Sequence, residues 1–164
     1  MDKLVYDYTL DHHAVPATLG YEGFPKSCCV SINEVVCHGI PNEEEILEEG
    51  DIVNVDCTTI LDGYYADASR MFIIGKTTPE KEISSCGKEC LEIGMQVAKP
   101  YCFVGDIGNA IDKHARKNGF SIVRDLCGHG VGLEFHEEPD VEHYGRKGTG
   151  MLWSQAWCSQ SSQW

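Results

Sequence analysis

The chain is poor in basic residues, and this shortage argues against one broad class of partner. Only 13 of its 164 residues are Lys or Arg, against 26 Asp or Glu, so the formal net charge is -13. Contacts with the phosphates of nucleic acid need clusters of Lys and Arg, so we expect no nucleic-acid partner. An acidic surface is compatible with cation binding, but it is also a common way to keep a domain soluble.

Long apolar runs are lacking too. No stretch approaches the roughly 20 apolar residues of a membrane-spanning helix, so we expect no membrane association. The charged start, Met1 to Leu4, has no apolar block behind it and predicts no signal peptide. The nine cysteines are odd in number and lack the close pairs of a zinc finger. Together these features predict reduced thiols in a single cytoplasmic domain.

The stretch from Asp56 to Asp67 organises the rest of the chain. Alternating apolar residues precede it and β-rich residues follow it, and Asp62-Gly63 is a strong turn signal between them. This pattern predicts a hairpin whose two strands bring Asp56 and Asp67 to face each other. Two facing carboxylates repel unless a cation lies between them, and divalent metal ions suit such hard oxygen ligands. The alternative is a pair of surface aspartates near a turn.

The remaining helices and strands are predicted from the spacing of apolar residues and from residues that favour helix ends. Helices are predicted at three places and strands at two, and the acidic run 43–49 is interpreted as a solvated turn of helix. Thr78 and Pro79 suit the start of the second helix, and Gly119 suits the end of the third. The predicted helices cover 3–12, 78–97 and 106–118, and the predicted strands cover 27–36 and 120–126.

Three histidines lie at predicted strand ends, where loops carry function more often than cores do. His38 precedes a Gly and a Pro, His129 is flanked by glycines, and His136 follows seven residues later. Two carboxylates and three histidines form a metal-hydrolase constellation in kind. A competing structural zinc site would use Cys86 and Cys90 at helical spacing, but a second ligand pair is missing, so buried thiols are favoured.

Six motifs cover nearly all of residues 14–151. They are Gly20–Ser27, Asn33–Pro41, Gly50–Asp56, Gly63–Asp67, Gly128–Gly132 and His136–Pro139. In their order and spacing they resemble the motifs of a known family, the type I methionine aminopeptidases, which are dinuclear-metal peptidases with the pita-bread fold. Gly-Phe-Pro-Lys-Ser and Cys-His-Gly-Ile-Pro favour methionine aminopeptidases over the related proline peptidases.

The resemblance implies a fold and a set of roles. The fold would be an incomplete α+β pita-bread (creatinase/aminopeptidase) fold with a curved antiparallel sheet and covering helices. Asp56 would chelate one metal ion, Asp67 would bridge two, and His129 would hold the other. His38 would contact the substrate and assist proton transfer, and His136 would hydrogen-bond the scissile peptide group. The methionine pocket would be lined by Tyr21, Phe24, Cys29 and Phe135.

The resemblance also implies cofactors and substrates. The complete family site holds two divalent ions, which could be Co, Mn, Fe or Zn, and acts on the N-termini of peptides and nascent proteins. We expect a monomer for the complete enzyme. The family needs two further glutamate ligands in its last third, and this chain has neither, so its site is expected to be incomplete. We therefore predict little or no aminopeptidase activity for this chain.

The last residues depart from the family pattern. We interpret 1–151 as part of a catalytic domain, cut at both ends relative to the family, and 152–164 as an aberrant tail. The tail has no carboxylate and holds all three tryptophans. One permitted set of codons for 153–164, read in another frame, encodes Val-Pro-Gly-Met-Val-Phe-Thr-Ile-Glu-Pro-Met, which resembles the missing ligand segment. A frameshift is one explanation, and a naturally divergent tail is the other.

A second class of function is also open. The chain could be a non-catalytic pita-bread module that recognises a protein partner. Such a module has no reason to keep His38, Asp56, Asp67, His129 and His136 at the family's spacing, so the damaged-enzyme interpretation is favoured.

Overall fold

The computed structural model describes residues 1–76, 80–153 and 159–160, and the chain divides into two compact units. Unit 1 comprises Met1–Lys81 and Val131–Phe135, and unit 2 comprises Glu82–Gly130 and His136–Trp164. Within the described residues, no helix has the length and apolar character needed to cross a membrane. Each unit has its own core and is described by itself.

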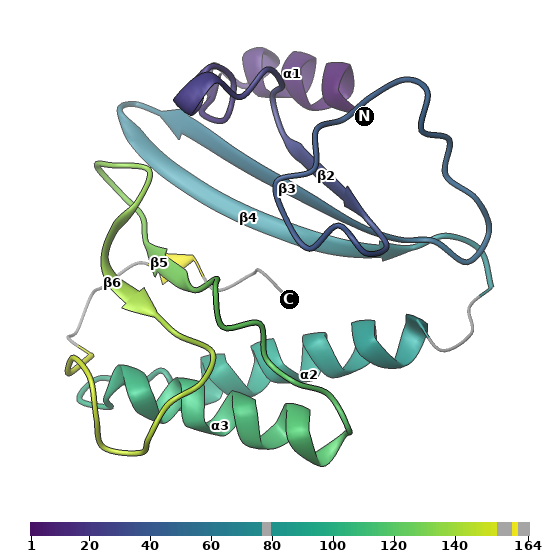
Figure 1. The fold of residues 1–164 in the computed structure, drawn as a ribbon. Coiled ribbons are helices and arrows are strands. Elements are labelled where there is room, and N and C mark those ends of the chain that lie inside the picture. Colours follow the sequence, from purple (N-terminus) through teal and green to yellow (C-terminus); the bar gives the residue numbers. More distant parts are fainter. Residues whose placement is uncertain (77–79, 154–158, 161–164) are drawn as a thin grey trace. The chain divides into compact units, whose positions relative to one another are not determined.

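Unit 1 is an antiparallel sheet with a helix on one face (Figure 1). The long central strand β3 pairs with β1 and β2 along one edge and with β4 along the other. Thr9 of the helix is buried, and Val5 packs against the core of the sheet. The elements are α1 (Asp2–Asp11), β1 (Val15–Pro16), the short 3₁₀ turn η1 (Tyr21–Gly23), β2 (Cys29–Ile32), β3 (Ile52–Leu61) and β4 (Tyr64–Ile73).

The predicted hairpin is confirmed, and its turn has a local cause. Leu61 pairs with Tyr64, so the loop has only Asp62 and Gly63 between the strands. Both loop residues have positive φ, 53° and 86°, as a type I′ turn requires. Asp tolerates this conformation and Gly adopts it without strain, so these two residues set the register of all ten strand pairs that follow.

The two faces of this sheet differ in chemistry. On the face covered by α1, Cys28, Val30 and Val53 form a small buried core. On the opposite face the buried side chains of β2 and β3 are the thiol of Cys29 and four polar groups, those of Ser31, Asn54, Asp56 and Thr58. Buried polar side chains cost stability unless they are satisfied, so this face is the natural place to look for chemistry.

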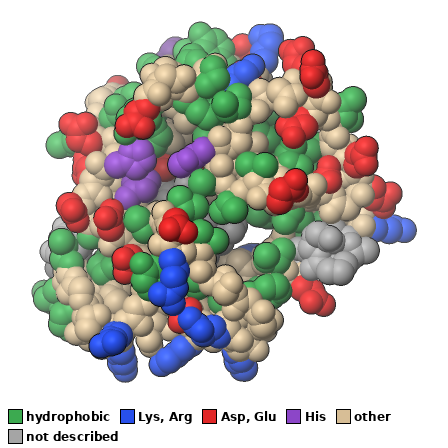
Figure 2. Space-filling view, in the orientation of Figure 1, with side chains coloured by type: hydrophobic (Ala, Val, Ile, Leu, Met, Phe, Trp, Pro, Cys, Tyr) green, Lys and Arg blue, Asp and Glu red, His purple; other side chains and the backbone are tan. Residues whose placement is uncertain are grey.

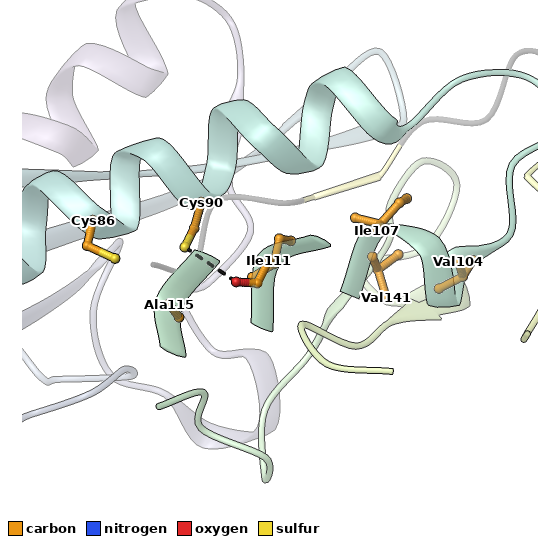
Figure 3. Packing of buried hydrophobic residues seen from close by; sticks show 7 residues of the cluster. All are labelled: Cys86, Cys90, Val104, Ile107, Ile111, Ala115 and Val141. Carbon is orange, nitrogen blue, oxygen red and sulfur yellow. Dashed lines mark hydrogen bonds between the residues drawn. The ribbon is translucent and has the colours of Figure 1, made fainter. Parts of the chain in front are cut away.

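Unit 2 is built on two amphipathic helices that pack along each other (Figure 3). Its core joins residues of both helices to one strand residue, and the Cys90 Sγ lies 4.0 Å from the carbonyl oxygen of Ile111. The buried members are Cys86, Cys90, Val104, Ile107, Ile111, Ala115 and Val141. The elements are α2 (Glu80–Val97), α3 (Val104–Lys117), β5 (Gly128–Gly130), β6 (Glu137–Val141) and β7 (Ser159–Gln160).

Helix α3 is fixed at both ends. At its start, the Asp106 carboxylate accepts hydrogen bonds from the backbone N–H groups of Phe103 (3.0 Å) and Gly148 (2.8 Å). At its end, Gly119 adopts φ +83° just past the last turn, as predicted. Arg116 and Lys117 lie in that last turn and complement the helix dipole. Figure 2 shows basic side chains gathered over the region of α3.

Several predicted elements are corrected by the structure. The strand predicted at 120–126 is not formed. Phe120 and Ile122 are partly buried against the helical core of unit 2, and the residue between them and the three after them are exposed, but among the described residues this segment pairs with no strand. The strand predicted at 27–36 is confined to Cys29–Ile32, because the chain turns at Asn33, whose φ is +51°. The acidic run 43–49 is not helical. Thr78 and Pro79, predicted to begin the second helix, lie outside the described residues, as does most of the tail.

Candidate metal and substrate site

The carboxylates of the hairpin lie on one face of the sheet. Asp56 pairs with Ser69 and Asp67 pairs with Thr58. Residues paired across strands, and residues two apart along one strand, share a face, so Asp56 and Asp67 are diagonal neighbours. The prediction that they face each other across the hairpin is refined: they share a face but are offset by two positions of the ladder. Such diagonals span about 7–8 Å between Cα atoms, which leaves room for a cation between the carboxylates.

Thr58 orients the second carboxylate. Its hydroxyl donates a hydrogen bond to Asp67 Oδ1 at 2.7 Å, and its side chain is 3% exposed. A buried hydroxyl with one accepting partner holds that carboxylate oxygen in a defined direction. Thr58 was missed by the sequence analysis, although its spacing of two from Asp56 already placed it on the same face.

Burial and the negative charges of these aspartates raise the pKa of two nearby cysteine thiols. Cys29 is paired with Asp56 across β2 and β3, so both side chains belong to the polar face. Burial, and then the negative charges of Asp56 and Asp67, raise the pKa of the Cys29 thiol to about 12. Burial and Asp56 also raise the pKa of the Cys37 thiol. Cys29 is therefore a neutral sulfur near pH 7, and Cys37 is a neighbour of the site that the sequence analysis did not identify.

The loop that carries His38 is bound closely to β2. The Val30 N–H donates to the Gly39 carbonyl at 2.9 Å, and the Gly39 N–H donates to the Ser31 hydroxyl at 3.1 Å. A Cβ on Gly39 would lie 2.1 Å from the Val30 carbonyl oxygen, so only glycine fits here. His38 itself has φ +56° and an exposed side chain. The loop therefore holds this histidine at the surface beside the strand that carries Cys29.

Aromatic side chains form a cluster in unit 1. The ring of Phe135 lies 4.6 Å from the ring of Tyr21 and 5.7 Å from that of Tyr65, measured between centroids. The segment that carries Phe135 is joined to β4, because the Tyr65 N–H donates to the Gly132 carbonyl at 2.7 Å. Two predicted pocket residues, Tyr21 and Phe135, are thus brought together. Tyr65 was missed, although it lies two residues before Asp67 and on its face.

Phe24, the remaining aromatic residue predicted for the pocket, follows the 3₁₀ turn. It is half-buried, and its N–H donates to the Tyr21 carbonyl at 2.8 Å. Gly20 and Gly23, with φ of +85° and +86°, allow the tight turn that separates the two rings along the chain.

Two of the histidines of unit 2, His129 and His136, are adjacent in space. The rings of His129 on β5 and His136, just before β6, lie 4.3 Å apart between centroids. Gly130 pairs with Glu137 between them, and a Cβ at Gly130 would lie 2.4 Å from the Glu138 carbonyl oxygen. Glycine is thus required where the two strands approach. His129 is buried and His136 is exposed.

The hydrogen bond of His129 bears on metal binding. Its Nδ1 lies 2.8 Å from the carbonyl oxygen of Gly130. A carbonyl oxygen only accepts, so Nδ1 carries the proton, and Nε2 of the neutral ring carries the lone pair that a metal ion needs. Histidine ligands of metals are commonly oriented by such a bond to the other nitrogen.

The donor chemistry of these residues fits a divalent cation. Within unit 1, Asp56 and Asp67 are two carboxylates on one face of the sheet, and carboxylate oxygens suit such ions. Within unit 2, considered by itself, His129 is a buried imidazole in the tautomer suited to coordination. In the part of the chain that the structure describes, no group of three or more His, Cys, Asp or Glu side chains is arranged as a metal cage. The alternative zinc site at Cys86 and Cys90 is not supported, since both thiols are buried in the helical core, as predicted.

Comparison with known proteins identifies the family to which the chain belongs. The sequence model of metallopeptidase family M24 matches residues 1–155. Because the match spans most of the sequence, the chain belongs to this family of metallopeptidases.

Within that family the chain is similar to methionine aminopeptidases. It is 51% identical over 144 residues to methionine aminopeptidase A of Synechocystis sp. (strain ATCC 27184 / PCC 6803 / Kazusa), covering 87% of this chain and 57% of that protein. It is 48% identical over 154 residues to methionine aminopeptidase of Escherichia coli (strain K12), covering 93% and 58%. The chain therefore spans a little over half the length of these relatives.

The fold agrees with the sequence comparison. The crystal structure of methionine aminopeptidase from Rickettsia prowazekii superposes with a TM-score of 0.92 at 45% identity, covering 95% of this chain and 63% of that one. The pita-bread fold implied by the resemblance is thus confirmed over the part of the fold that this chain covers.

Proposed function

We propose that this chain carries part of a methionine aminopeptidase site, which removes the N-terminal methionine from peptides and nascent proteins. The observation that carries the proposal is the polar face of unit 1, where Asp56 is paired with Cys29 and is a diagonal neighbour of Asp67. The similarity to methionine aminopeptidases supports the substrate class, since these relatives carry that activity in their names.

In this proposal Asp56, Asp67 and His129 hold the metal ions. Bound divalent ions supply Lewis acidity, which lowers the pKa of a water molecule and stabilises negative charge on the substrate carbonyl. The chain's own contribution is orientation. Thr58 fixes one oxygen of Asp67, and the Gly130 carbonyl fixes the ring of His129.

The pocket residues suit an apolar thioether. The Tyr21 and Phe135 rings offer an aromatic surface, and Phe24 follows Tyr21 closely in the chain. Cys29, with its raised pKa, presents a neutral polarisable sulfur instead of a thiolate. Sulfur and aromatic groups attract a methionine side chain by about 0.3–1.5 kcal/mol per contact. The four side chains therefore favour methionine over a charged first residue.

His38 and His136 are assigned the movement of protons. Both side chains are exposed, and each is held by a glycine-dependent backbone contact, through Gly39 and Gly130 respectively. An exposed imidazole can donate a hydrogen bond to a peptide carbonyl or accept a proton from an amine.

The expected competence of this chain is low. The family resemblance calls for five metal ligands, and Asp56, Asp67 and His129 are the three that the sequence matches. Loss of oriented groups around a metal commonly costs 10–100-fold each, so we expect at least about 100-fold less activity than a relative with the full ligand set.

The test measures turnover and metal binding together. Release of methionine from a Met-Ala-Ser peptide with added Mn²⁺ is compared between this chain, its Asp56→Asn variant and the Escherichia coli enzyme. Calorimetry with Mn²⁺ on the first two proteins gives the affinity. Weak or absent turnover with Mn²⁺ binding that Asp56→Asn weakens supports the proposal. An Mn²⁺ affinity that is unchanged by Asp56→Asn would instead favour the non-catalytic module. A rate of methionine release equal to that of the E. coli enzyme would refute the expected low activity.

We also propose that residues 152–164 replace a ligand-bearing segment through a shift of reading frame. The family match ends at residue 155, which is consistent with a departure near this point. Sequencing the coding DNA across codons 148–164 decides the matter. An extra base that restores Phe-Thr-Ile-Glu-Pro would support the shift, and the present reading on independent clones would exclude it.

A further inference from the structure

Two thiols lie opposite each other on the face of the sheet that points away from the carboxylates. Cys29 pairs with Asp56 in the antiparallel ladder of β2 and β3. Continuing that register by one residue places Cys28 opposite Cys57, where the two strands run side by side (Figure 1). Alternation along a strand turns both of these side chains to the face opposite Cys29 and Asp56.

The hydrogen bonds of the ladder identify the kind of pair. The Asn33 N–H donates to the Ile52 carbonyl at 3.0 Å, so these residues form a hydrogen-bonded pair. The Val30 N–H instead donates away from β3, to Gly39. Pairs alternate between the two kinds, so the Cys28 pair, two residues before Val30, is non-hydrogen-bonded. In such pairs the Cα atoms lie about 4.5 Å apart and the side chains are closest, within the range a disulfide spans.

The surroundings bring the two sulfurs together. Cys28 is completely buried in the core of unit 1, and the half-buried Cys57 packs against it. Cys28 is thus sealed from solvent, and Cys57 is the member of the pair that a small oxidant can reach.

We propose that Cys28 and Cys57 form a cross-strand dithiol site that small hydroperoxides oxidise to a disulfide. The Cys57 sulfur attacks the peroxide, the O–O bond breaks, and a sulfenic acid forms with release of water from hydrogen peroxide. The Cys28 thiol then attacks that sulfur and displaces a second water, closing the S–S bond. Two thiols are oxidised, one hydrogen peroxide is reduced, and a thiol reductant reverses the step.

The bridge would act on the neighbouring site. Cys28 and Cys57 are the sequence neighbours of Cys29 and Asp56, so the disulfide would tie β2 to β3 one residue from the pair that carries a pocket residue and a metal ligand. Regulation by reversible oxidation is the common use of a disulfide in reducing compartments. The inference rests on the register of unit 1 and does not depend on the proposed aminopeptidase activity.

The other cysteines offer a matched control. Cys29 adjoins Cys28 in sequence but belongs to the opposite face, so it cannot bridge to Cys57 without turning the strand over. Cleavage after glutamate separates the relevant thiols into three peptides. Residues 23–34 hold Cys28 and Cys29, residues 35–43 hold Cys37, and residues 50–80 hold Cys57.

The experiment treats the full chain with limiting hydrogen peroxide, alkylates the remaining thiols and maps the digest by mass spectrometry without reduction. We expect peptide 23–34 joined to peptide 50–80 with a mass loss of two hydrogen atoms. The product should persist in Cys29→Ser and vanish in both Cys28→Ser and Cys57→Ser, each checked by circular dichroism for an unchanged fold.

Oxidation of the wild-type chain in urea shows how the cysteines pair when the chain is unfolded, and this control requires no substitution. There the register is lost, and the cysteines should pair as a mixture. A native digest with the same mixture as the urea digest would overturn the proposal. A native bridge that survives Cys28→Ser and is lost in Cys29→Ser would overturn it as well, because it would show that the opposite face holds the reactive pair.

Discussion

The buried side chains of the two units differ in polarity. Unit 2 fills its core with apolar side chains of α2 and α3, and Ile111 is among its most buried residues. Unit 1 has a small apolar core on one face of its sheet and buries Asn54, Asp56 and Thr58 on the other. Apolar burial stabilises a fold directly, whereas buried polar groups are tolerated where they serve chemistry. The contrast marks the polar face of unit 1 as a place where buried groups are kept for chemistry and not for stability.

The largest expected effect tests the apolar side of this comparison. Ile111→Ala removes a side chain that is 2% exposed between the two helices, and such losses typically cost about 2–5 kcal/mol of unfolding free energy. The partly buried Trp153 packs on the same cluster, so urea unfolding followed by tryptophan fluorescence reports on unit 2. Met95→Ala, at a 55% exposed position of α2, is the control. Equal midpoints for the two variants would contradict the assignment of this core.

The second prediction concerns a polar exception inside unit 2. His143 is 5% exposed, and burial lowers its pKa from 6.5 to about 4. The folded state therefore binds this proton less readily than the unfolded state. The resulting stability is complete above pH 6.5 and is lost as the pH falls from 6.5 through 4. At pH 4.5 the loss amounts to about 2–3 kcal/mol relative to pH 7.5.

Comparison with His143→Gln isolates this contribution, since the titrating carboxylates are common to both proteins. Urea unfolding at pH 7.5 and 4.5 should show a smaller acid destabilisation for the variant. His114→Gln, at a surface position where the imidazole lies 2.8 Å from Glu89, should leave the acid destabilisation larger than in His143→Gln. An identical pH dependence for wild type and His143→Gln would show that burial does not hold this histidine neutral.

The third prediction tests polar burial in unit 1. Thr58→Val keeps the shape of the side chain but removes the hydroxyl that donates to Asp67. We expect a loss of about 1 kcal/mol, measured as faster hydrogen exchange over β3 and β4. Thr58→Ser retains the donor and should exchange more slowly than Thr58→Val. Should the serine variant exchange as fast as the valine variant, the methyl group and not the hydrogen bond would be the stabilising part.

The smallest expected effect lies on the surface, outside both cores. Arg116 donates to both carboxylate oxygens of Asp112 at 2.9 Å, four residues apart on α3. Exposed helical pairs of this kind contribute about 0.3–0.5 kcal/mol, so Asp112→Asn should shift the urea midpoint only slightly and less at high salt. A loss as large as that of Ile111→Ala would mean that surface charge, and not apolar burial, holds α3 in place.

The elements that sequence analysis predicted well are those with local causes. The hairpin follows from Asp62-Gly63, whose conformational preferences need no distant contact. The end of α3 follows from Gly119 in the same way. The strand predicted at 120–126 failed for a non-local reason. Its alternating burial is real, but Phe120 and Ile122 pack on helices, and the sequence does not say whether a partner strand is present.

In the candidate site, too, the sequence identified residues that belong to short motifs and missed contacts between distant segments. The sequence identified Asp56, Asp67, His129, Tyr21 and Phe135 by motif, and their roles stay proposals. The two-residue turn at Asp62-Gly63 already pairs Thr58 with Asp67, but the sequence could not show that the Thr58 hydroxyl donates to that carboxylate, because the direction of a side chain depends on its packing in the fold. Nor could it find Tyr65 in the aromatic cluster, since the cluster forms only when the segment carrying Phe135 returns to β4.

The sequence by itself determined the family, the hairpin turn and the residue types available for chemistry, since motifs and turn preferences are properties of short segments. Only the tertiary structure decided that Cys29 shares the face of Asp56 and Asp67 while Cys28 meets Cys57 on the other, because no short turn joins β2 to β3. The physical reason is the two-residue period of a strand. A shift of one position exchanges the faces, and only the pairing between strands sets that position.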